Sequence, residues 1–276
     1  MSRRQGKSQG GCYDQVFIEM QVTKKQTRGT RHWGGPVYYL ADTSRSRTVY
    51  VGLWDPDRVG IDVFKGAVGM NIRMLKEQIE HLSDGIVFNA ENHSYVKNGI
   101  LMPSVTQIMK PLYDKVYGKV NQTDSDNGKD RGKEIHAAIE IFNNYGMKDI
   151  RLEYKGYLES FIKWLKDKEI TVIASEIVLC HPLYGYAGTI DAICMHGEDI
   201  FLADYKTGEL NYELNGVQLQ AYTDMWSANN MPEISEKRSL GLSDTDYKQE
   251  IHKKYSAKHK SVFEACFKIN QFIKEL

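Results

Sequence analysis

The stretch from Tyr186 to Gly208 constrains the fold most, because it contains two apolar runs that each carry one aspartate. Ile, Thr and Phe are enriched on either side of the sequence His-Gly-Glu-Asp, and Gly197 lies inside this turn. The pattern predicts a β-hairpin with Asp191 in the first strand and Asp204 late in the second. Since side chains alternate between the faces of a strand, Asp204 and Lys206 are predicted to share one face. The sequence therefore predicts two neighbouring carboxylates and one ammonium group on a sheet.

The surroundings of this hairpin are strongly acidic. Residues 175–225 include eight acidic residues and a single basic one, Lys206. Such a site repels phosphate unless a cation intervenes, and oxygen ligands on strands suit Mg²⁺ or Mn²⁺. A bound cation could polarise a phosphodiester and lower the pKa of an attacking water, while Lys206 orients that water or stabilises the developing charge. The alternative for Asp191 and Asp204 taken alone is a hairpin with solvated edge carboxylates and a lysine that pairs across the strand.

Four short motifs follow one another in a defined order. They are Gly132-Lys133-Glu134-Ile135-His136, Gly188-Thr189-Ile190-Asp191, Asp204-Tyr205-Lys206-Thr207-Gly208 and Gln218-Leu219-Gln220-Ala221-Tyr222. Together they resemble the motifs of the PD-(D/E)XK nucleases, specifically the RecB-like and phage exonuclease branch. The D-x-K and Q-x-x-x-Y patterns are weak by themselves, so the resemblance depends on the order of all four. It extends from about residue 86 to about residue 250.

The resemblance implies an α/β, restriction-endonuclease-like core with the order α-β-β-β-α-β, in which helices flank a mixed sheet. We predict that residues 86–276 form this nuclease domain. Residues 1–85 are predicted to form a small, basic, β-rich N-terminal domain of unknown role, with strands over 14–22, 36–41 and 48–54 and a helix from about 68 to 81. The turn between the second and third of these strands is expected to carry Arg45 and Arg47.

Further local patterns place the elements of the nuclease domain. Residues 86–101 are typical of a short β-meander with a tight turn at Asn98-Gly99. Ser104 and Gln107 fit a capping box that begins a helix ending near Tyr117. The polar residues 120–129 are expected to form a mobile loop. The remaining expected elements are helices over about 130–145, 151–168 and 216–227, a strand over 171–180, a hairpin over 239–250, and a C-terminal helix over 252–276 with Val262, Phe263, Cys266, Phe267, Ile269 and Phe272 facing inward.

The resemblance also assigns roles in a metal site. It implies that Asp191, Asp204 and the Tyr205 carbonyl bind the metal, that His136 is a further ligand, and that Lys206 positions or polarises the nucleophile. The alternative for His136 is a surface pairing with the residue one helical turn later, Glu140.

Glu176 on the expected strand 171–180 is a candidate to border the metal site or to bridge to it, and an outward polar position is the alternative.

Five residues are candidates for substrate binding. Gln218 and Tyr222 are four apart on a helix and point the same way, and the resemblance implies that they help to position the active site and contact DNA. Arg131 and Lys133 are candidates for phosphate contacts, with solvated charges as the alternative. Tyr186 either faces the substrate or packs in the core.

The activity that the resemblance implies is that of a Mg²⁺- or Mn²⁺-dependent DNA nuclease, and more narrowly of an exonuclease in phage-type DNA processing or recombination. Its partner would be DNA, either single-stranded or with duplex ends. A single-strand-annealing or other recombination partner and an oligomeric assembly are compatible with this function. Two alternatives are a nucleic-acid-binding relative without catalysis and an adaptor protein that acts through residues 1–85.

The distribution of charge along the chain bears on whether it contacts nucleic acid. The net charge is zero, but residues 1–50 carry nine Lys or Arg against three acidic residues, which is typical of a phosphate-binding segment or of a solvated basic tail.

The four cysteines form no C-x-x-C pair, so we expect neither a zinc site nor an iron–sulfur cluster, and Cys180 and Cys194 are expected in the core. No apolar run approaches the roughly 20 residues of a membrane helix, and the N-terminal residues lack the apolar region of a secretory signal. We therefore expect a cytoplasmic protein that does not contact membranes, located in a bacterial host if the gene is phage-encoded.

Overall fold

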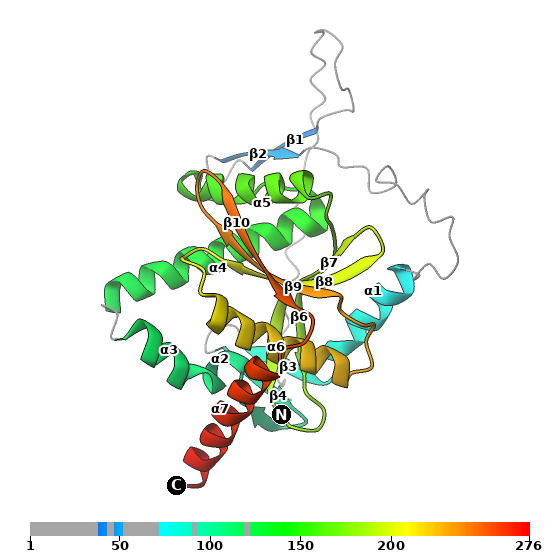
Figure 1. Cartoon of the computed structure of the whole chain (residues 1–276). Helices are drawn as coiled ribbons and strands as arrows, with labels where there is room; N and C mark the ends of the chain where they lie inside the picture. The colour runs from blue at the N-terminus through cyan, green and yellow to red at the C-terminus, as the bar shows by residue number, and fades with distance from the viewer. Residues whose placement is uncertain (1–37, 43–46, 52–71, 90–92, 119–121) are drawn as a thin grey trace, which may run out of the picture. The chain divides into compact units, whose positions relative to one another are not determined.

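The computed structural model describes residues 38–42, 47–51, 72–89, 93–118 and 122–276, and the chain divides into two compact units, residues 1–53 and 54–276 (Figure 1). In the first unit, β1 (Tyr38–Asp42) pairs antiparallel with β2 (Arg47–Val51). This confirms the hairpin that was predicted there. The strand expected over residues 14–22 and the turn residue Arg45 lie outside the described residues.

A five-stranded mixed sheet with the order β10-β9-β8-β7-β6 forms the centre of the second unit. Neighbouring strands are antiparallel except β8 and β9, which are parallel and are connected through helix α6. Such a crossover is necessary because two parallel strands cannot be joined by a tight turn. The elements are α4 (Gln122–Tyr145), α5 (Lys155–Asp167), β6 (Thr171–Cys180), β7 (Ala187–His196), β8 (Asp199–Lys206), α6 (Tyr212–Ala228), β9 (Glu236–Leu242) and β10 (Tyr247–Lys253). This sequence of elements confirms the predicted α-β-β-β-α-β order.

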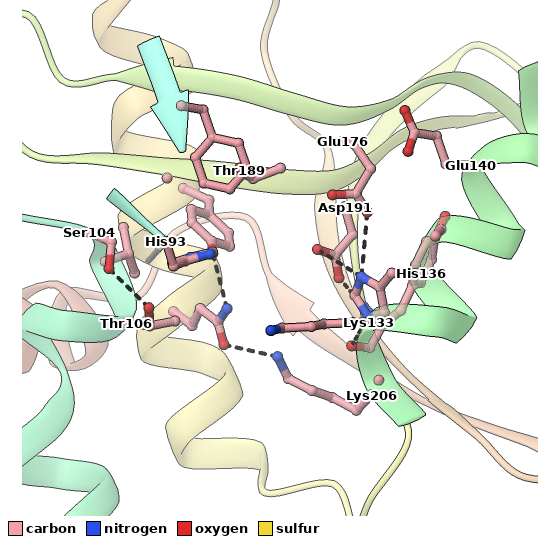
Figure 2. Close-up of a pocket in the computed structure, with 18 of the residues that line it drawn as sticks. His93, Ser104, Thr106, Lys133, His136, Glu140, Glu176, Thr189, Asp191 and Lys206 are labelled. Carbon is pink, nitrogen blue, oxygen red and sulfur yellow. Dashed lines mark hydrogen bonds and ion pairs between the residues drawn. The ribbon is translucent and has the colours of Figure 1, made fainter. Parts of the chain in front are cut away.

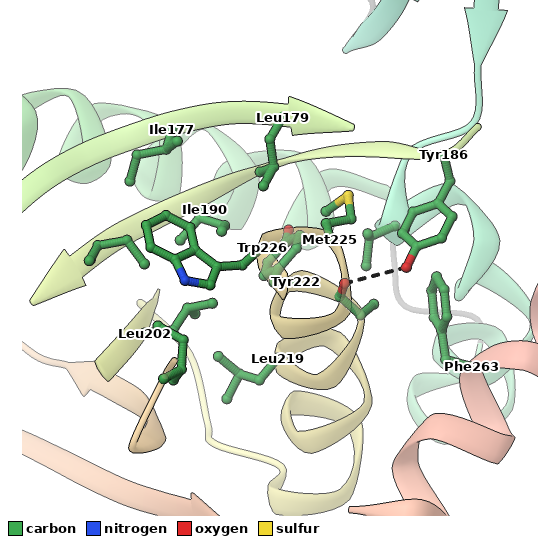
Figure 3. Close-up of a cluster of buried hydrophobic side chains, with 14 of the residues drawn as sticks. Ile177, Leu179, Tyr186, Ile190, Leu202, Leu219, Tyr222, Met225, Trp226 and Phe263 are labelled. Atoms are coloured by element: carbon green, nitrogen blue, oxygen red, sulfur yellow. Dashed lines mark hydrogen bonds between the residues drawn. The ribbon is translucent and has the colours of Figure 1, made fainter. Parts of the chain in front are cut away.

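Each face of this sheet is covered by helices. Alternate residues of β8 separate into two apolar clusters, since Leu202 packs with α6 whereas Phe201 and Ala203 pack with residues of α4 and α5. Figure 3 shows the first cluster, where Leu219 and Trp226 of α6 lie against the sheet. Burying each large apolar side chain contributes about 1.5–3 kcal/mol. Apolar packing on both faces therefore stabilises the part of the sheet where β7 and β8 carry their aspartates.

Helix α1 (Ile72–Glu80), followed by the 3-10 turn η1 (His81–Ser83), packs with this second unit. Its buried side chains Leu75 and Ile79 lie in the same apolar cluster as Ile173 of β6. We expected the helix to close an N-terminal domain that ends at residue 85. Because the buried side of α1 packs with β6, the helix lies with the sheet inside the compact unit of residues 54–276. The domain boundary at residue 85 stays a prediction.

A second, three-stranded antiparallel sheet consists of β3 (Ile86–Asn89), β4 (Ser94–Lys97) and β5 (Ile100–Met102). Asn98 and Gly99 both have positive φ angles, of 52° and 79°. A type I′ turn requires this conformation at its two central positions. The meander predicted for residues 86–101 is thus confirmed.

The predicted capping box is also present. Ser104 Oγ accepts a hydrogen bond from the backbone N–H of Gln107 at 3.1 Å, and Gln107 Oε1 accepts one from the N–H of Ser104 at 2.9 Å. These contacts begin α2 (Val105–Ile108), which is followed after Met109 by α3 (Lys110–Tyr117).

The mobile loop predicted for residues 120–129 is wrong over 122–129, where the chain is already helical in α4. The prediction relied on polar composition, but residue propensities are weak compared with the gain of one hydrogen bond for each residue added to an existing helix. Residues 119–121 lie outside the described part of the chain. Between α4 and α5, only the short 3-10 turn η2 (Leu152–Tyr154) intervenes.

Helix α7 (Ala257–Glu275) follows the prediction in its first half only. Phe263 and Cys266 are buried, whereas Ile269 and Phe272, which were predicted to face inward, are 48% and 61% exposed. The helix projects beyond the elements on which it packs (Figure 1). Periodicity identifies an apolar face but does not show how far the partner surface extends. Among the helices described here, none has both the length and the apolar character of a membrane span.

Candidate metal centre

The site begins where the β7–β8 ladder ends. Ala192 pairs with Ala203, and beyond this pair Oδ2 of Asp191 accepts a hydrogen bond from the backbone N–H of Tyr205 at 2.6 Å. The carboxylate of Asp191 thereby takes the place of the next ladder bond and lies beside the strand that carries Asp204. Both aspartates are buried, at 9% and 1% exposure. The predicted proximity of these two acids is confirmed.

Glu176 enters the site from β6. Its neighbours Ser175 and Ile177 pair with Ala192 and Ile190, so Glu176 lies opposite Asp191. Its φ angle of 50° belongs to the left-handed region, which is costly for a residue other than glycine. Strain of this kind persists where the surrounding structure enforces it and is concentrated at functional sites. The conformation places a second carboxylate beside Asp191.

His136 reaches the two carboxylates from α4, where the neighbouring Ile135 and the later Ile139 are buried. Its Nδ1 atom lies 3.4 Å from Oε1 of Glu176 and 3.7 Å from Oδ1 of Asp191. Figure 2 shows the imidazole pointing toward both acids. His136 thus faces these acids and not Glu140, so the surface pairing that was the alternative is not what the structure shows.

The protonation of His136 follows from these neighbours. Burial by itself would lower the pKa of His136, but the Asp191 and Glu176 carboxylates outweigh it and raise the pKa to about 9. The ring nitrogen Nε2 lies 3.2 Å from the carbonyl oxygen of Tyr205, to which it can donate a hydrogen bond. Such a bond orients the ring and directs Nδ1 toward the acids, as in many histidines that bind metals.

Lys206 forms a second part of the site together with Asp204 and α6. Its Nζ atom lies 2.7 Å from Oδ2 of Asp204 and donates a hydrogen bond to Oε1 of Gln218 at 3.0 Å. The same Oε1 accepts a hydrogen bond from the hydroxyl of Tyr113 at 3.2 Å, and Nε2 of Gln218 donates to the hydroxyl of Tyr222 at 3.1 Å. Gln218 and Tyr222 therefore share one helix face, as predicted, and hold the lysine in place.

In this second part of the site, burial and charge pairing have opposite effects on the pKa values of Asp204 and Lys206. Burial raises the pKa of Asp204 to about 6, although the neighbouring Lys206 ammonium acts in the opposite direction. Burial also tends to lower the pKa of Lys206, but the charge of Asp204 outweighs this and raises the pKa above its ordinary value. Lys206 is therefore a cation and a hydrogen-bond donor at neutral pH.

A metal ion fits this arrangement. His136, Glu176 and Asp191 each offer one ligand atom, and these atoms lie within 4.8 Å of one another. In addition, Oδ1 of Asp204 is buried and has no hydrogen-bond partner among the described residues. Nitrogen and carboxylate oxygen donors suit a divalent cation.

The ligand group differs in part from the predicted one. Asp204 and the Tyr205 carbonyl were predicted as ligands together with Asp191 and are not in this group of three. The Asp204 carboxylate lies 2.7 Å from Lys206 Nζ, and the Tyr205 carbonyl oxygen lies 3.2 Å from Nε2 of His136. Their role as ligands stays a prediction. Glu176, predicted only to border or bridge the site, lies inside the group. The sequence showed that Glu176 is on a strand, but its position depends on the register between β6 and β7.

The metal-binding group lies in a cavity of about 490 Å³. One wall comes from α4 and the strands, and another comes from the β3–β4 hairpin and the start of α2, through Phe88, His93, Tyr95, Ser104 and Thr106. No role was assigned to this second wall from the sequence. An exposed aromatic residue followed five positions later by a histidine is too common a pattern to indicate a site before the fold is known.

The substrate-binding candidates are divided by the structure. Lys133 is exposed and lines the cavity. Gln218 and Tyr222 also line the cavity. Arg131 instead donates a hydrogen bond to the carbonyl oxygen of Thr207 at 3.0 Å, which supports the motif that carries Lys206.

Tyr186 is only 2% exposed and packs against Phe263 (Figure 3). Its hydroxyl oxygen lies 3.4 Å from the carbonyl oxygen of Ala221, to which it donates a hydrogen bond. Core packing, the alternative considered for Tyr186, is the arrangement found.

Comparison with known proteins adds little to this picture. No family model matches the chain, and no curated protein matches it. Among solved structures, the crystal structure of an alkaline exonuclease from Laribacter hongkongensis is similar over 63% of this chain and 92% of that chain, with 11% sequence identity and a TM-score of 0.28.

Proposed function

We propose that the protein is a divalent-metal-dependent DNA nuclease that hydrolyses phosphodiester bonds, and more narrowly an exonuclease of phage-type DNA processing or recombination. The observation that supports it best is the convergence of His136, Glu176 and Asp191 beside the Asp204–Lys206 pair, within one cavity. Isolated acidic clusters are common, but here the acids lie beside the ammonium group of Lys206, which is fixed by Asp204 and Gln218. The order of the four sequence motifs supports the same proposal and narrows it to DNA.

His136, Glu176 and Asp191 would hold the metal. Asp204, whose Oδ1 is buried without a hydrogen-bond partner among the described residues, is a further candidate ligand. A divalent ion would supply charge stabilisation at the phosphoryl group and a lowered pKa for the attacking water. Mg²⁺ and Mn²⁺ are the expected ions, because carboxylate oxygens predominate among the donors. Binding would displace a proton from His136, whose Nδ1 otherwise carries the positive charge between the two acids.

Lys206 acts as a fixed hydrogen-bond donor and not as a base. Its raised pKa keeps it protonated, and Asp204 and Gln218 hold its Nζ atom from two sides. Such a group can orient the attacking water or stabilise the negative charge that develops on the phosphoryl oxygens. Lys133, which is exposed on the cavity wall, supplies a second cation for the phosphate backbone.

The test is a cleavage assay on linear single-stranded, linear duplex and circular DNA with Mg²⁺, Mn²⁺ or EDTA. We expect cleavage with either metal and none with EDTA. Degradation of linear substrates alone would establish an exonuclease. Asp191→Asn is expected to lower cleavage by at least about 100-fold, because it removes a charged ligand.

Glu140→Gln is the matched control, since Glu140 lines the same cavity but lies outside the ligand group. It should retain wild-type cleavage within about threefold. Titration of Mn²⁺ by calorimetry should show binding to the wild type and the control and a loss of affinity in Asp191→Asn. DNA binding without metal-dependent cleavage would favour a non-catalytic nucleic-acid-binding protein, and the absence of both would favour an adaptor; either result would overturn the proposal.

A further inference from the structure

The cavity wall opposite the ligand group carries an aromatic surface that the proposed chemistry does not use. Phe88 of β3 stacks on Tyr95 of β4 with ring centroids 4.8 Å apart and an angle of 29° between the ring planes. Both rings line the cavity. Tyr95 is fully buried, whereas Phe88 remains 36% exposed. The stack therefore has a buried side, formed by Tyr95, and an accessible side, formed by Phe88.

The buried side is anchored to the strand that carries the metal ligands. The Tyr95 hydroxyl and Oγ1 of Thr189 form a hydrogen bond of 2.9 Å, and Thr189 precedes Asp191 by two residues on β7. Thr189 and Asp191 both line the cavity. The aromatic surface is thus held at a defined position relative to the acids, although β3 and β4 belong to a different sheet.

His93 completes this surface. It has a positive φ angle of 50°, and its ring lies edge-on to Phe88 and Tyr95, with centroids 5.4 and 5.5 Å away. Figure 2 shows His93 on one side of the cavity and His136 on the other, with the ammonium groups of Lys133 and Lys206 between them. Flat rings on one side, cations in the centre and acids on the far side match the base, the phosphate and the scissile bond of a nucleotide.

The size of the cavity limits what can enter. Its volume of about 490 Å³ lies within the range of sites that enclose a small molecule, roughly 300–1,000 Å³. This is room for a single nucleotide with its base turned out of a helix. A base in the interior of a duplex could not bring its face against Phe88, because its stacked neighbours already cover both faces.

We infer that the cavity binds an unpaired nucleotide, with its base against Phe88 and His93 and the adjoining phosphate at Lys133. The substrate class is then single-stranded DNA or the frayed end of a duplex. This inference rests on the proposed nuclease function and adds to it the preference for an unpaired strand. Stacking on an aromatic side chain suits any base, so the preference is for strand state and not for sequence.

Binding is measured with single-stranded oligonucleotides that carry the fluorescent base 2-aminopurine at or near one end. The full-length Asp191→Asn variant serves as the background, so that Mg²⁺ can be present while cleavage is at least about 100-fold slower. Stacking on Phe88 should quench the 2-aminopurine fluorescence. Adding Phe88→Ala should abolish this quenching and weaken single-strand binding by about tenfold, whereas Phe88→Leu should retain part of the affinity without the quenching.

Val87→Ala is the matched control. Val87 is adjacent on β3, is 67% exposed, and lies on the opposite face of the strand from Phe88. It should leave binding and quenching unchanged. If Phe88→Ala lowers the melting temperature, His93→Ala provides a second test, with a smaller expected loss of affinity of about threefold.

Cleavage by the otherwise wild-type enzyme distinguishes this inference from the proposed function. Phe88→Ala should lower kcat/KM for single-stranded DNA by about tenfold, mainly through KM. Metal-dependent cleavage that is equally efficient in the wild type and in Phe88→Ala, with unchanged quenching, would overturn the stacking site and leave the nuclease function standing. Absence of any cleavage by the wild type would instead remove the function on which the inference rests.

Discussion

Two clusters of buried polar side chains lie on the central sheet, and they use the same residue types for opposite purposes. The first is the metal-binding cluster with Lys206 and His136. The second, here called the closed cluster, consists of Lys237, Ser239, His252 and Gln220, from β9, β10 and α6. In it, Nζ of Lys237 donates a hydrogen bond to Oε1 of Gln220 at 2.7 Å, and Oγ of Ser239 lies 2.9 Å from Nε2 of His252.

The pKa values of the histidine and the lysine are raised in the first cluster and lowered in the closed cluster. The acids around His136 raise its pKa to about 9, whereas burial and the nearby Lys237 lower the pKa of His252 to about 4. The pKa of Lys206 is raised beside Asp204, but burial lowers the pKa of Lys237 to about 8. The difference is one of neighbours, since carboxylates outweigh burial at His136 and Lys206, whereas burial outweighs the weaker influence of Asp224 on Lys237 and of Glu213 on His252.

Exposure separates the clusters as well. Lys237 and His252 are 0% and 1% exposed, so water and ligands do not reach them. The ammonium of Lys206 and the ring of His136 line a cavity. A buried polar group becomes a candidate for chemistry when its partners leave a charge or a lone pair directed at accessible space, and it remains structural when its partners enclose it.

The sharpest test of this contrast replaces both lysines by methionine. Lys206→Met should lower cleavage by at least about 100-fold, because it removes a fixed donor to the developing charge. Lys237→Met should keep cleavage within about threefold and preserve or raise the melting temperature, since it removes a buried cation that costs free energy to desolvate.

Cleavage rates and thermal melting of the two purified variants provide the measurement. Equal loss of cleavage in both would mean that the clusters are not functionally separate.

A second test exchanges the two glutamines that hold these lysines. Gln218→Leu should lower kcat by about tenfold, because Lys206 keeps its Asp204 partner but loses one direction of support. It should also lower stability, because the buried Tyr222 hydroxyl loses its hydrogen-bond donor. Gln220→Leu should destabilise the fold by about 1–3 kcal/mol, because it leaves buried Lys237 without this acceptor.

Urea unfolding and steady-state kinetics on both variants distinguish the two effects. A large loss of kcat in Gln220→Leu at a temperature where it remains folded would contradict the structural role of the closed cluster.

The third test concerns the dependence of stability on pH. The pKa of His252 is about 4 in the folded protein and about 6.5 when unfolded, so the unfolded chain binds more protons between these values. Stability should therefore fall as the pH decreases from 6.5 to 4, by up to about 1.4 kcal/mol per pH unit from this residue.

His252→Gln should reduce that slope, as measured by urea unfolding at several pH values in that range. An unchanged slope would show that His252 does not titrate in this way.

Much of the site could be predicted because it depends on local periodicity. Alternation along β8 puts Asp204 and Lys206 on one face, and a spacing of four puts Gln218 and Tyr222 on one side of α6. The place of Glu176 depended on strand register. The outward position of Phe272 depended on which surfaces meet.

The sequence by itself determined the order of the elements, the two strand-borne aspartates and the lysine beside them, since these features follow from the intrinsic geometry of strands and helices. Only the tertiary structure decided that His136, Glu176 and Asp191 come together as the candidate ligand group and that Phe88 faces them across a cavity. Those contacts join residues 15 to about 100 positions apart, and packing of whole elements brings them together. Short-range patterns carry no information about such distances.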